Sequence, residues 1–171
     1  NDLHEHHHYH SDPSSKILTD LFANYGNEVE LNQEHNDIID ELSRYINPIE
    51  VEGVLRDLKT KLEESGRNDT FLRDGLWLKD DFRRKIEKYR HSPTAQKIFA
   101  YLLAAIRSHF RSNIFHHIEK MSDSDLDVAI LNDVIKPVLE TIPSSEPLIT
   151  EDTLLGMMYF LTGNCFLEWS K

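Results

Sequence analysis

The residues with the clearest chemical potential are an arginine followed by two histidines near the middle of the chain, Arg111, His116 and His117. A guanidinium can stabilise negative charge on a reacting phosphoryl group, and an imidazole can move a proton near neutral pH. On a regular helix, however, Arg111 would lie about 140° from His116 and about 120° from His117. These side chains can converge only if the helix breaks or if two copies of the chain meet.

This R-x4-H pattern resembles the active-site signature of the HEPN family, all-helical ribonucleases often found in microbial conflict systems. The resemblance implies that Arg111 would act with His116 or His117 beside the scissile phosphate of an RNA. The competing interpretation is that these are ordinary polar residues beside an amphipathic helix. An HEPN-like ribonuclease is therefore one alternative for this chain.

The other common catalytic and cofactor motifs are missing from the sequence. It contains no GxGxxG, no GxxxxGK[ST], no GxSxG and no HExxH. The single cysteine, Cys165, has no second cysteine with which to build a zinc ribbon. The run SDSDLD at residues 122–127 lacks the glycine and glutamate of a calcium loop, and helix capping explains it better. We expect no catalytic residue and no cofactor, so the chain is not predicted to be an enzyme.

Histidine is concentrated at the start of the chain. Such a tract can bind Ni²⁺ or Zn²⁺, but structural zinc sites draw their ligands from a folded frame. We therefore predict that residues 1–13 are a His-rich flexible segment or linker, with no metal site. A metal site is the less favoured alternative, and its ligands would be His4, His6, His8 and His10.

Length and composition indicate one compact domain. The chain has 171 residues, of which 39% are hydrophobic, enough for a substantial core. Only six Gly and six Pro are present, which argues against a loop-rich β-sandwich and against disorder. A lone cysteine fits a reducing compartment, so we predict a cytoplasmic location. No apolar run approaches the ~20 residues of a membrane span, and no signal peptide pattern is present.

Apolar residues recur with a helical period from Ser14 onward. The stripes fall at residues 17–22, 38–46, 51–62, 71–89, 98–118, 126–139 and 150–160. In the fourth stripe the apolar face is predicted to comprise Leu72, Leu76, Phe82, Ile86 and Tyr89. The longest, from Ile98 to Ile118, predicts about six turns of one regular helix.

Capping residues and helix breakers mark the ends of these stripes. Ser92 followed by Pro93, Ser122 and Thr150 are predicted to begin helices. Ser65-Gly66 and Gly163-Asn164 are predicted to end them, and Pro137 should kink its helix or end its regular part. Residues 165–169 are predicted to dock on the core. The predicted fold class is all-α, a compact bundle of six to seven helices with a short C-terminal extended tail, over residues 14–171.

Charge is distributed unevenly along the chain. Residues 83–120 carry nine Lys or Arg against two Glu, a net charge of +7, so the rest carries −18 of the total of −11. This basic window could dock an acidic partner or a nucleic-acid backbone. Alternatively, its cations pair with acidic neighbours such as Glu28, Glu30, Glu34, Glu50 and Glu52. The predicted partner-contacting residues are Arg83, Arg84, Lys88, Arg107, Arg111 and Trp169, the last in an exposed apolar segment.

Several segments, in chain order, carry a family resemblance. They are residues 40–46, 54–62, 77–82, 92–99, 110–118, 135–137 and 156–169. Together they resemble the C-terminal domains of effector proteins in ABC-three-component systems, a class that includes the Lamassu-type antiphage systems. The resemblance covers most of residues 30–169 and is a pattern of apolar and small positions.

The resemblance implies a function in coupling. In that family an SMC-like ABC ATPase and a small middle component hold an effector, whose N-terminal domain, often a nuclease, does the damage. The C-terminal domain connects the effector to the other two components. We therefore expect a protein-interaction domain of an antiviral effector. The nuclease domain is absent from this chain, and the His-rich start that follows Asn1 would be the linker. A nucleic-acid-binding helical module is a further alternative, and no membrane partner is expected.

Overall fold

The structure is a computed structural model that describes residues 13–23, 57–143, 146, 148–164 and 166–170. The α-helices are α1 (Pro13–Ala23), α3 (Leu58–Glu64), α4 (Asp69–Lys88), α5 (Pro93–Phe110), α6 (Asp123–Ile130), α7 (Lys136–Leu139) and α8 (Glu151–Gly163). Two π-helical segments, η2 (Arg111–Phe115) and η4 (Leu131–Ile135), and a 3-10 turn, η3 (Ile118–Lys120), complete the regular elements. No strand occurs in this part of the chain, so the predicted all-α fold is confirmed. The predicted stripe at 38–46 and the first half of that at 51–62 lie outside it.

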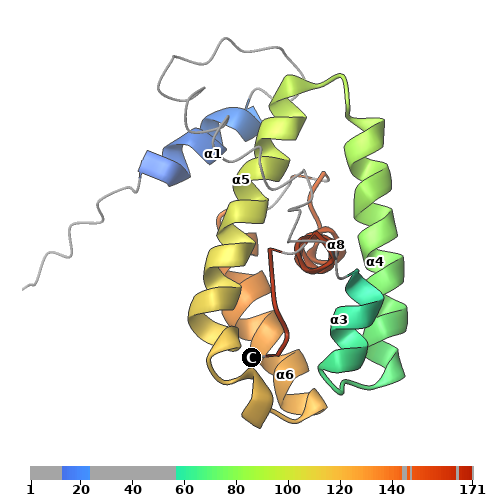
Figure 1. Cartoon of the computed structure of the whole chain (residues 1–171). Helices are drawn as coiled ribbons and strands as arrows, with labels where there is room; N and C mark the ends of the chain where they lie inside the picture. Colours follow the sequence, from blue (N-terminus) through green and yellow to red (C-terminus); the bar gives the residue numbers. More distant parts are fainter. Residues whose placement is uncertain (1–12, 24–56, 144–145, 147, 165, 171) are drawn as a thin grey trace, which may run out of the picture.

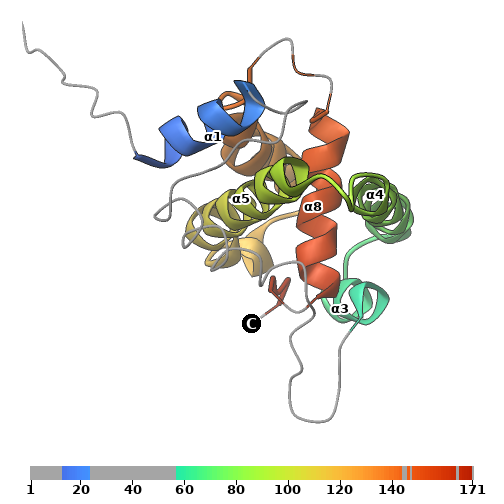
Figure 2. The same ribbon diagram turned by 90° about the horizontal axis from the view of Figure 1, so that it is seen from above.

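Helix α8 lies at the centre of the bundle (Figure 1). It packs mainly against α4, and also against α5, α3 and η4. Seen from above, α4 and α5 lie on opposite sides of α8 and cross it steeply, while α1 packs on α5 (Figure 2). Between Thr153 and Thr162 every side chain of α8 except that of Leu155 is buried. A helix that is apolar on all sides must be covered on all sides, so α8 dictates where its neighbours lie.

Glycines allow α4 and α8 to approach closely. A Cβ atom on Gly156 of α8 would lie 2.5 Å from the carbonyl oxygen of Leu78 in α4. A Cβ atom on Gly75 of α4 would lie 2.8 Å from the ring of Tyr159 in α8. Each helix thus offers a position without a side chain to its partner, and the interface depends on both.

The buried face of α4 differs from the predicted one. Phe71, Gly75, Leu78 and Phe82 are buried, whereas Leu76 is 44% exposed. The predicted stripe was wrong at Leu76. Helix α8 packs against the face of α4 that carries Gly75, because only that face allows the two backbones to approach closely, and Leu76 lies off this face. Gly75 is therefore a packing position, where the missing side chain leaves room for the ring of Tyr159.

Helix α5 does not continue regularly to Ile118, and this prediction was wrong. The core residues Ile106, Phe110, Ile114 and Ile118 are spaced by four, and each such step turns a regular α-helix about 40° past one full turn. The π-helical segment η2 has more residues per turn, which removes this drift. All four side chains remain 0% exposed as a result.

The same solution recurs in the helix that runs from α6 through η4 to α7. Leu126, Ile130, Val134 and Val138 are again spaced by four, and all are buried. Pro137, expected to disturb this helix, is the second residue after η4 and has no N–H to donate to the carbonyl oxygen of Asp133. The Asn113 side-chain amide in η2 donates to that oxygen at 2.9 Å. The two π-helical segments are thus joined by one hydrogen bond.

The predicted helix ends are confirmed. The side-chain oxygens of Ser92, Ser122 and Thr150 accept hydrogen bonds from backbone N–H groups three residues later, at 3.2, 3.1 and 3.2 Å. Gly66 follows α3 with a φ of +73°, and Asn164 follows α8. Each residue satisfies backbone groups that a helix end leaves without a partner.

The C-terminal residues dock on the core, as predicted. Lys61 of α3 is 1% exposed, and its Nζ donates to the carbonyl oxygen of Leu167 at 2.9 Å and pairs with Glu168 at 3.0 Å. Trp169 stacks on Tyr159 of α8, with ring centroids 5.8 Å apart. Its indole N–H donates to the Thr162 hydroxyl at 3.0 Å. The tail therefore closes the end of the bundle between α3 and α8.

The α4–α8 interface yields the first prediction. Gly156→Ala should lower the free energy of unfolding by about 1–3 kcal/mol, because its methyl group meets backbone and the helices must separate. The matched control is Gly163→Ala, whose methyl group would meet the mobile end of Lys79. Thermal unfolding measures both. Equal loss of stability in the two variants would contradict the close approach.

Candidate interaction sites

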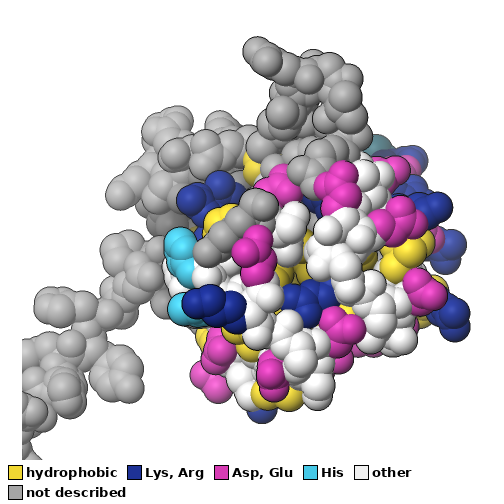
Figure 3. Space-filling model, turned by 60° about the horizontal axis from the view of Figure 1, so that its bottom comes forward, with side chains coloured by type: hydrophobic (Ala, Val, Ile, Leu, Met, Phe, Trp, Pro, Cys, Tyr) yellow, Lys and Arg dark blue, Asp and Glu magenta, His cyan; other side chains and the backbone are white. Residues whose placement is uncertain are grey.

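The predicted basic window is divided between two helices that do not form a single face. Figure 3 shows Lys and Arg side chains at two opposite edges of one face and also near its middle, with His side chains beside one edge group and acidic side chains among them. On α4, Arg83 and Arg84 both bind Asp80, with closest N–O distances of 2.9 Å. The hydrogen bond from Arg83 lowers the pKa of Asp80. Such exposed pairs contribute little to stability, but they offset part of the charge on α4.

Two further cations, Lys85 of α4 and Arg90 just after its end, are also engaged. Lys85 is half-buried, and its Nζ donates to the carbonyl oxygen of Leu148 at 2.7 Å and to the Thr153 hydroxyl at 3.0 Å. Burial lowers the pKa of Lys85. Arg90 pairs with Glu87 one turn earlier. The acidic partners suggested by the sequence, from Glu28 to Glu52, lie outside the described residues.

The largest exposed apolar side chain described in the structure is Trp77 of α4, which is 63% exposed. Arg84 and Lys88 follow it by seven and eleven residues, which places each of them within about 20° of Trp77 around the helix axis. We refer to Trp77, Arg84 and Lys88 as the α4 outer face. Both cations were predicted from the sequence, but Trp77 was missed. Its position off the buried stripe of Leu78 and Phe82 was the available signal.

Trp169 does not belong to an exposed apolar segment, and this prediction was wrong. It is 2% exposed and contacts Tyr159, Phe71 and Phe110, with ring centroids 5.8 to 5.9 Å away. The sequence predicted that Trp169 is exposed and made no prediction for the exposure of Trp77. Docking of the tail between α3 and α8 buries Trp169, and the close approach of α4 to α8 leaves Trp77 outside.

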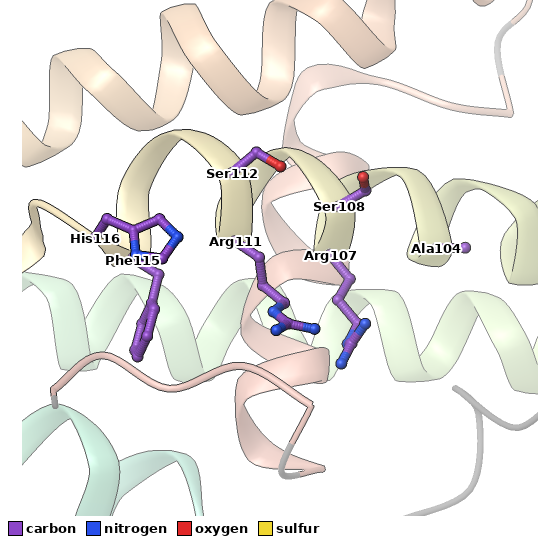
Figure 4. A pocket seen from close by; sticks show the side chains of 7 residues that line it. All are labelled: Ala104, Arg107, Ser108, Arg111, Ser112, Phe115 and His116. Atoms are coloured by element: carbon purple, nitrogen blue, oxygen red, sulfur yellow. The ribbon is translucent and has the colours of Figure 1, made fainter.

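The remaining predicted cations, Arg107 and Arg111, line a groove of about 370 Å³ along α5 and η2. Its described lining is Ala104, Arg107, Ser108, Arg111, Ser112, Phe115 and His116. These residues form two rows with a spacing of four, one of Arg, Arg and Phe and the other of Ser, Ser and His. Figure 4 shows Arg107, Arg111 and Phe115 projecting to one side of the helix, with Ser108 and Ser112 on its other side. We refer to these residues as the α5 groove.

The helix break that an Arg–His site required is present. Because η2 begins at Arg111, the chain turns less per residue there than in an α-helix, and Arg111 and His116 line the same groove. His117 is not among the described lining residues. Two guanidiniums, two hydroxyls and an imidazole make the groove suited to an anion. Among its described lining residues no carboxylate accompanies the single histidine.

A second groove of about 410 Å³ lies near the loop that precedes α8. It is lined by Leu139, Glu140, Ile142, Pro143, Glu146 and Ile149. The side chain of Glu146 accepts a hydrogen bond from the backbone N–H of Leu148 at 3.0 Å, so this carboxylate stabilises its own loop. None of these lining residues is a cation and two are acidic, so this groove differs from the α5 groove in its charge.

Metal and membrane sites were also considered. The described residues contain no group of three or more His, Cys, Asp or Glu that could hold a metal ion. The histidines at positions 4 to 10 lie outside these residues, so the structure does not address that alternative. No helix in the described part of the chain is both long and apolar enough to cross a bilayer.

Comparison with known proteins gives one match. A family model described as C-terminal domain 9 of the ABC-three component (ABC-3C) systems matches residues 57–169. The match runs from the residue before α3 to Trp169, and includes both the α4 outer face and the α5 groove. It confirms the resemblance seen in the sequence. No curated protein and no solved structure matches the chain significantly.

The contrast between the two tryptophans is directly measurable. In Trp169→Phe the remaining Trp77 should emit at the wavelength of a hydrated indole and be quenched readily by acrylamide. In Trp77→Phe the remaining Trp169 should emit at shorter wavelength and resist quenching, because it is 2% exposed. Similar quenching of the two variants, with circular dichroism showing both folded, would contradict the assignment.

Proposed function

The chain belongs to the family described as C-terminal domain 9 of the ABC-three component systems, and on that premise we propose that it is a protein-interaction domain. In this proposal it couples an effector to an SMC-like ABC ATPase and a small middle component, in an antiphage system of the Lamassu type. The effector activity, a nuclease, resides in another domain. The chain itself performs no catalysis.

The observation that carries the proposal is the exposure of Trp77. Tryptophan and arginine dominate the binding energy of protein interfaces, and a tryptophan that is 63% exposed on a well-packed helix has no evident role in the core. Burial of its ring by a partner would remove a large apolar area from water. The α4 outer face thus has an aromatic anchor accompanied by two cations.

The charges of the α4 outer face define the partner surface. Arg84 already pairs with Asp80, but it is largely exposed and has further donors to offer. Lys88 lies 5.5 Å from the ring centroid of Tyr89, which leaves its ammonium at the surface. A complementary surface would present an apolar pocket for Trp77 and carboxylates beside it. We assign this complementary surface to the ATPase or the middle component.

The composition of the α5 groove supports a non-enzymatic role. General acid–base hydrolysis of a phosphodiester moves one proton from the nucleophile and delivers another to the leaving group. The described residues of the groove include one imidazole, that of His116, and no carboxylate. A binding role uses all of the polar groups in the groove and needs no proton transfer.

Trp77→Ala should abolish or strongly weaken assembly with the other two components. Loss of a central aromatic anchor typically costs 2 kcal/mol or more, about thirtyfold in affinity. The measurement is co-purification of the tagged full-length effector with the ATPase and the middle component after co-expression. Val128→Ala is the matched control, because Val128 is 55% exposed on α6, away from the α4 outer face. Unchanged assembly of Trp77→Ala would rule out this face.

Charge reversal tests the electrostatic part of the interface separately. Arg84→Glu combined with Lys88→Glu should weaken assembly, and the effect should diminish at high salt because exposed charges are screened. Arg107→Glu combined with Arg111→Glu is the matched control, with the same change in net charge on another helix. Equal weakening by both pairs would indicate a general charge effect and contradict docking through α4.

A further inference from the structure

We propose that the α5 groove is a nucleotide-binding site, in which Arg107 and Arg111 hold the phosphate and Phe115 contacts the base. This site is independent of the docking function proposed for α4. It lies on a different helix, and its ligand belongs to a different chemical class. Nothing about the interaction function requires it.

The two guanidiniums of the groove are placed to share one anionic group. Arg107 and Arg111 lie one turn apart, about 6 Å along the axis, and their guanidiniums project to the same side (Figure 4). Within the described residues Arg111 forms no salt bridge, in contrast to Arg83, Arg84 and Arg90. Guanidinium forks match the geometry of phosphate oxygens and are favoured wherever phosphate is recognised.

The second row of the groove adds neutral donors. Ser108 and Ser112 also line the groove, on the side of the helix away from the two guanidiniums, and each hydroxyl has one O–H to donate. His116 lies at the end of the same row, and its imidazole can donate to a phosphate oxygen. None of the described lining residues is acidic.

The size of the groove and its aromatic edge favour a nucleotide over other anions. A volume of about 370 Å³ is at the lower end of the range for small-molecule sites, roughly 300–1,000 Å³. Phe115 is half-buried, continues the row of Arg107 and Arg111, and contacts His116 edge to face with centroids 5.8 Å apart. Stacking of a base on an aromatic ring contributes about 1–3 kcal/mol. An acidic peptide would satisfy the guanidiniums but would leave this ring without a matching partner.

The charge of the molecule argues against a long nucleic acid as the ligand. Affinity for a polyanion grows with the number of phosphates neutralised, and each must have its own cation. The groove offers two arginines, while the chain as a whole carries a net charge of −11. One phosphate with its base is therefore the unit that fits, either as a free mononucleotide or as the terminal nucleotide of a single strand.

The test is titration of the full 171-residue chain, by calorimetry, with AMP, GMP, UMP and inorganic phosphate. We expect at least one mononucleotide to bind at least tenfold more tightly than inorganic phosphate. Arg111→Ala and Arg107→Ala should each weaken that binding at least tenfold. Phe115→Leu should weaken nucleotide binding and leave phosphate binding unchanged. Arg84→Ala and His117→Ala, outside the groove, are the matched controls and should bind as the unmodified chain does.

A second arm distinguishes the two sources of nucleotide. A 5′-phosphorylated trinucleotide that binds more tightly than the mononucleotide would assign the ligand to a strand end, and the reverse order would assign it to a free nucleotide. Either result supports the site if Arg111→Ala abolishes the binding. Binding of phosphate as tight as that of every nucleotide, no binding, or binding only of an acidic peptide would overturn the proposal.

Cleavage of an RNA oligonucleotide by the same preparation would have a separate meaning. If His116→Ala abolished cleavage and spared binding, the groove would still be a nucleotide site, but the non-enzymatic role proposed for the chain would fail. The result of the Trp77→Ala assembly experiment does not depend on either outcome. The two proposals can therefore fail independently.

Discussion

The burial of α8 on all sides is the constraint on which the rest of the structure depends. A helix with almost no exposed side chain between Thr153 and Thr162 cannot lie at a surface, so α3, α4, α5 and η4 must surround it. The closest contact is at Gly156, where the backbone of α4 occupies the space that a side chain would take. The C-terminal tail then covers the end of α8. Lys61 of α3 binds Leu167 and Glu168 of the tail, and Trp169 stacks on Tyr159 of α8.

Coverage of α8 has consequences for the surface. Because α4 presents Gly75, Leu78 and Phe82 inward, Trp77 necessarily points away from the bundle. Its exposure therefore follows from the packing of the opposite face rather than from any local property of tryptophan. In the same way, the buried row from Ile106 to Ile118 turns the opposite side of α5 outward, and this side carries the arginines of the α5 groove. Both candidate sites are the outer faces of helices whose inner faces enclose α8.

Spacing by four residues explains the irregular parts of the fold. In each of two helices, four core residues recur at intervals of four, a period slightly longer than that of an α-helix. A π-helical segment in each keeps these residues in the core, and the Asn113–Asp133 hydrogen bond links the two segments where Pro137 removes a donor. The cost of one irregular turn is offset by full burial of Ile114 and Val134. Arg111 and His116 share a groove because of this turn, so the candidate site depends on core packing.

The sequence by itself determined the helical class, the helix ends at Ser92, Ser122 and Thr150, the docked tail and the family, because these depend on local capping, period and composition. It also identified every cation of both candidate sites. Only the tertiary structure decided which tryptophan is exposed, which cations pair with Asp80, and how Arg111 lies relative to His116. Those properties depend on how closely whole helices approach and on which residues a neighbour covers. A period counted along one helix contains no information about its neighbours.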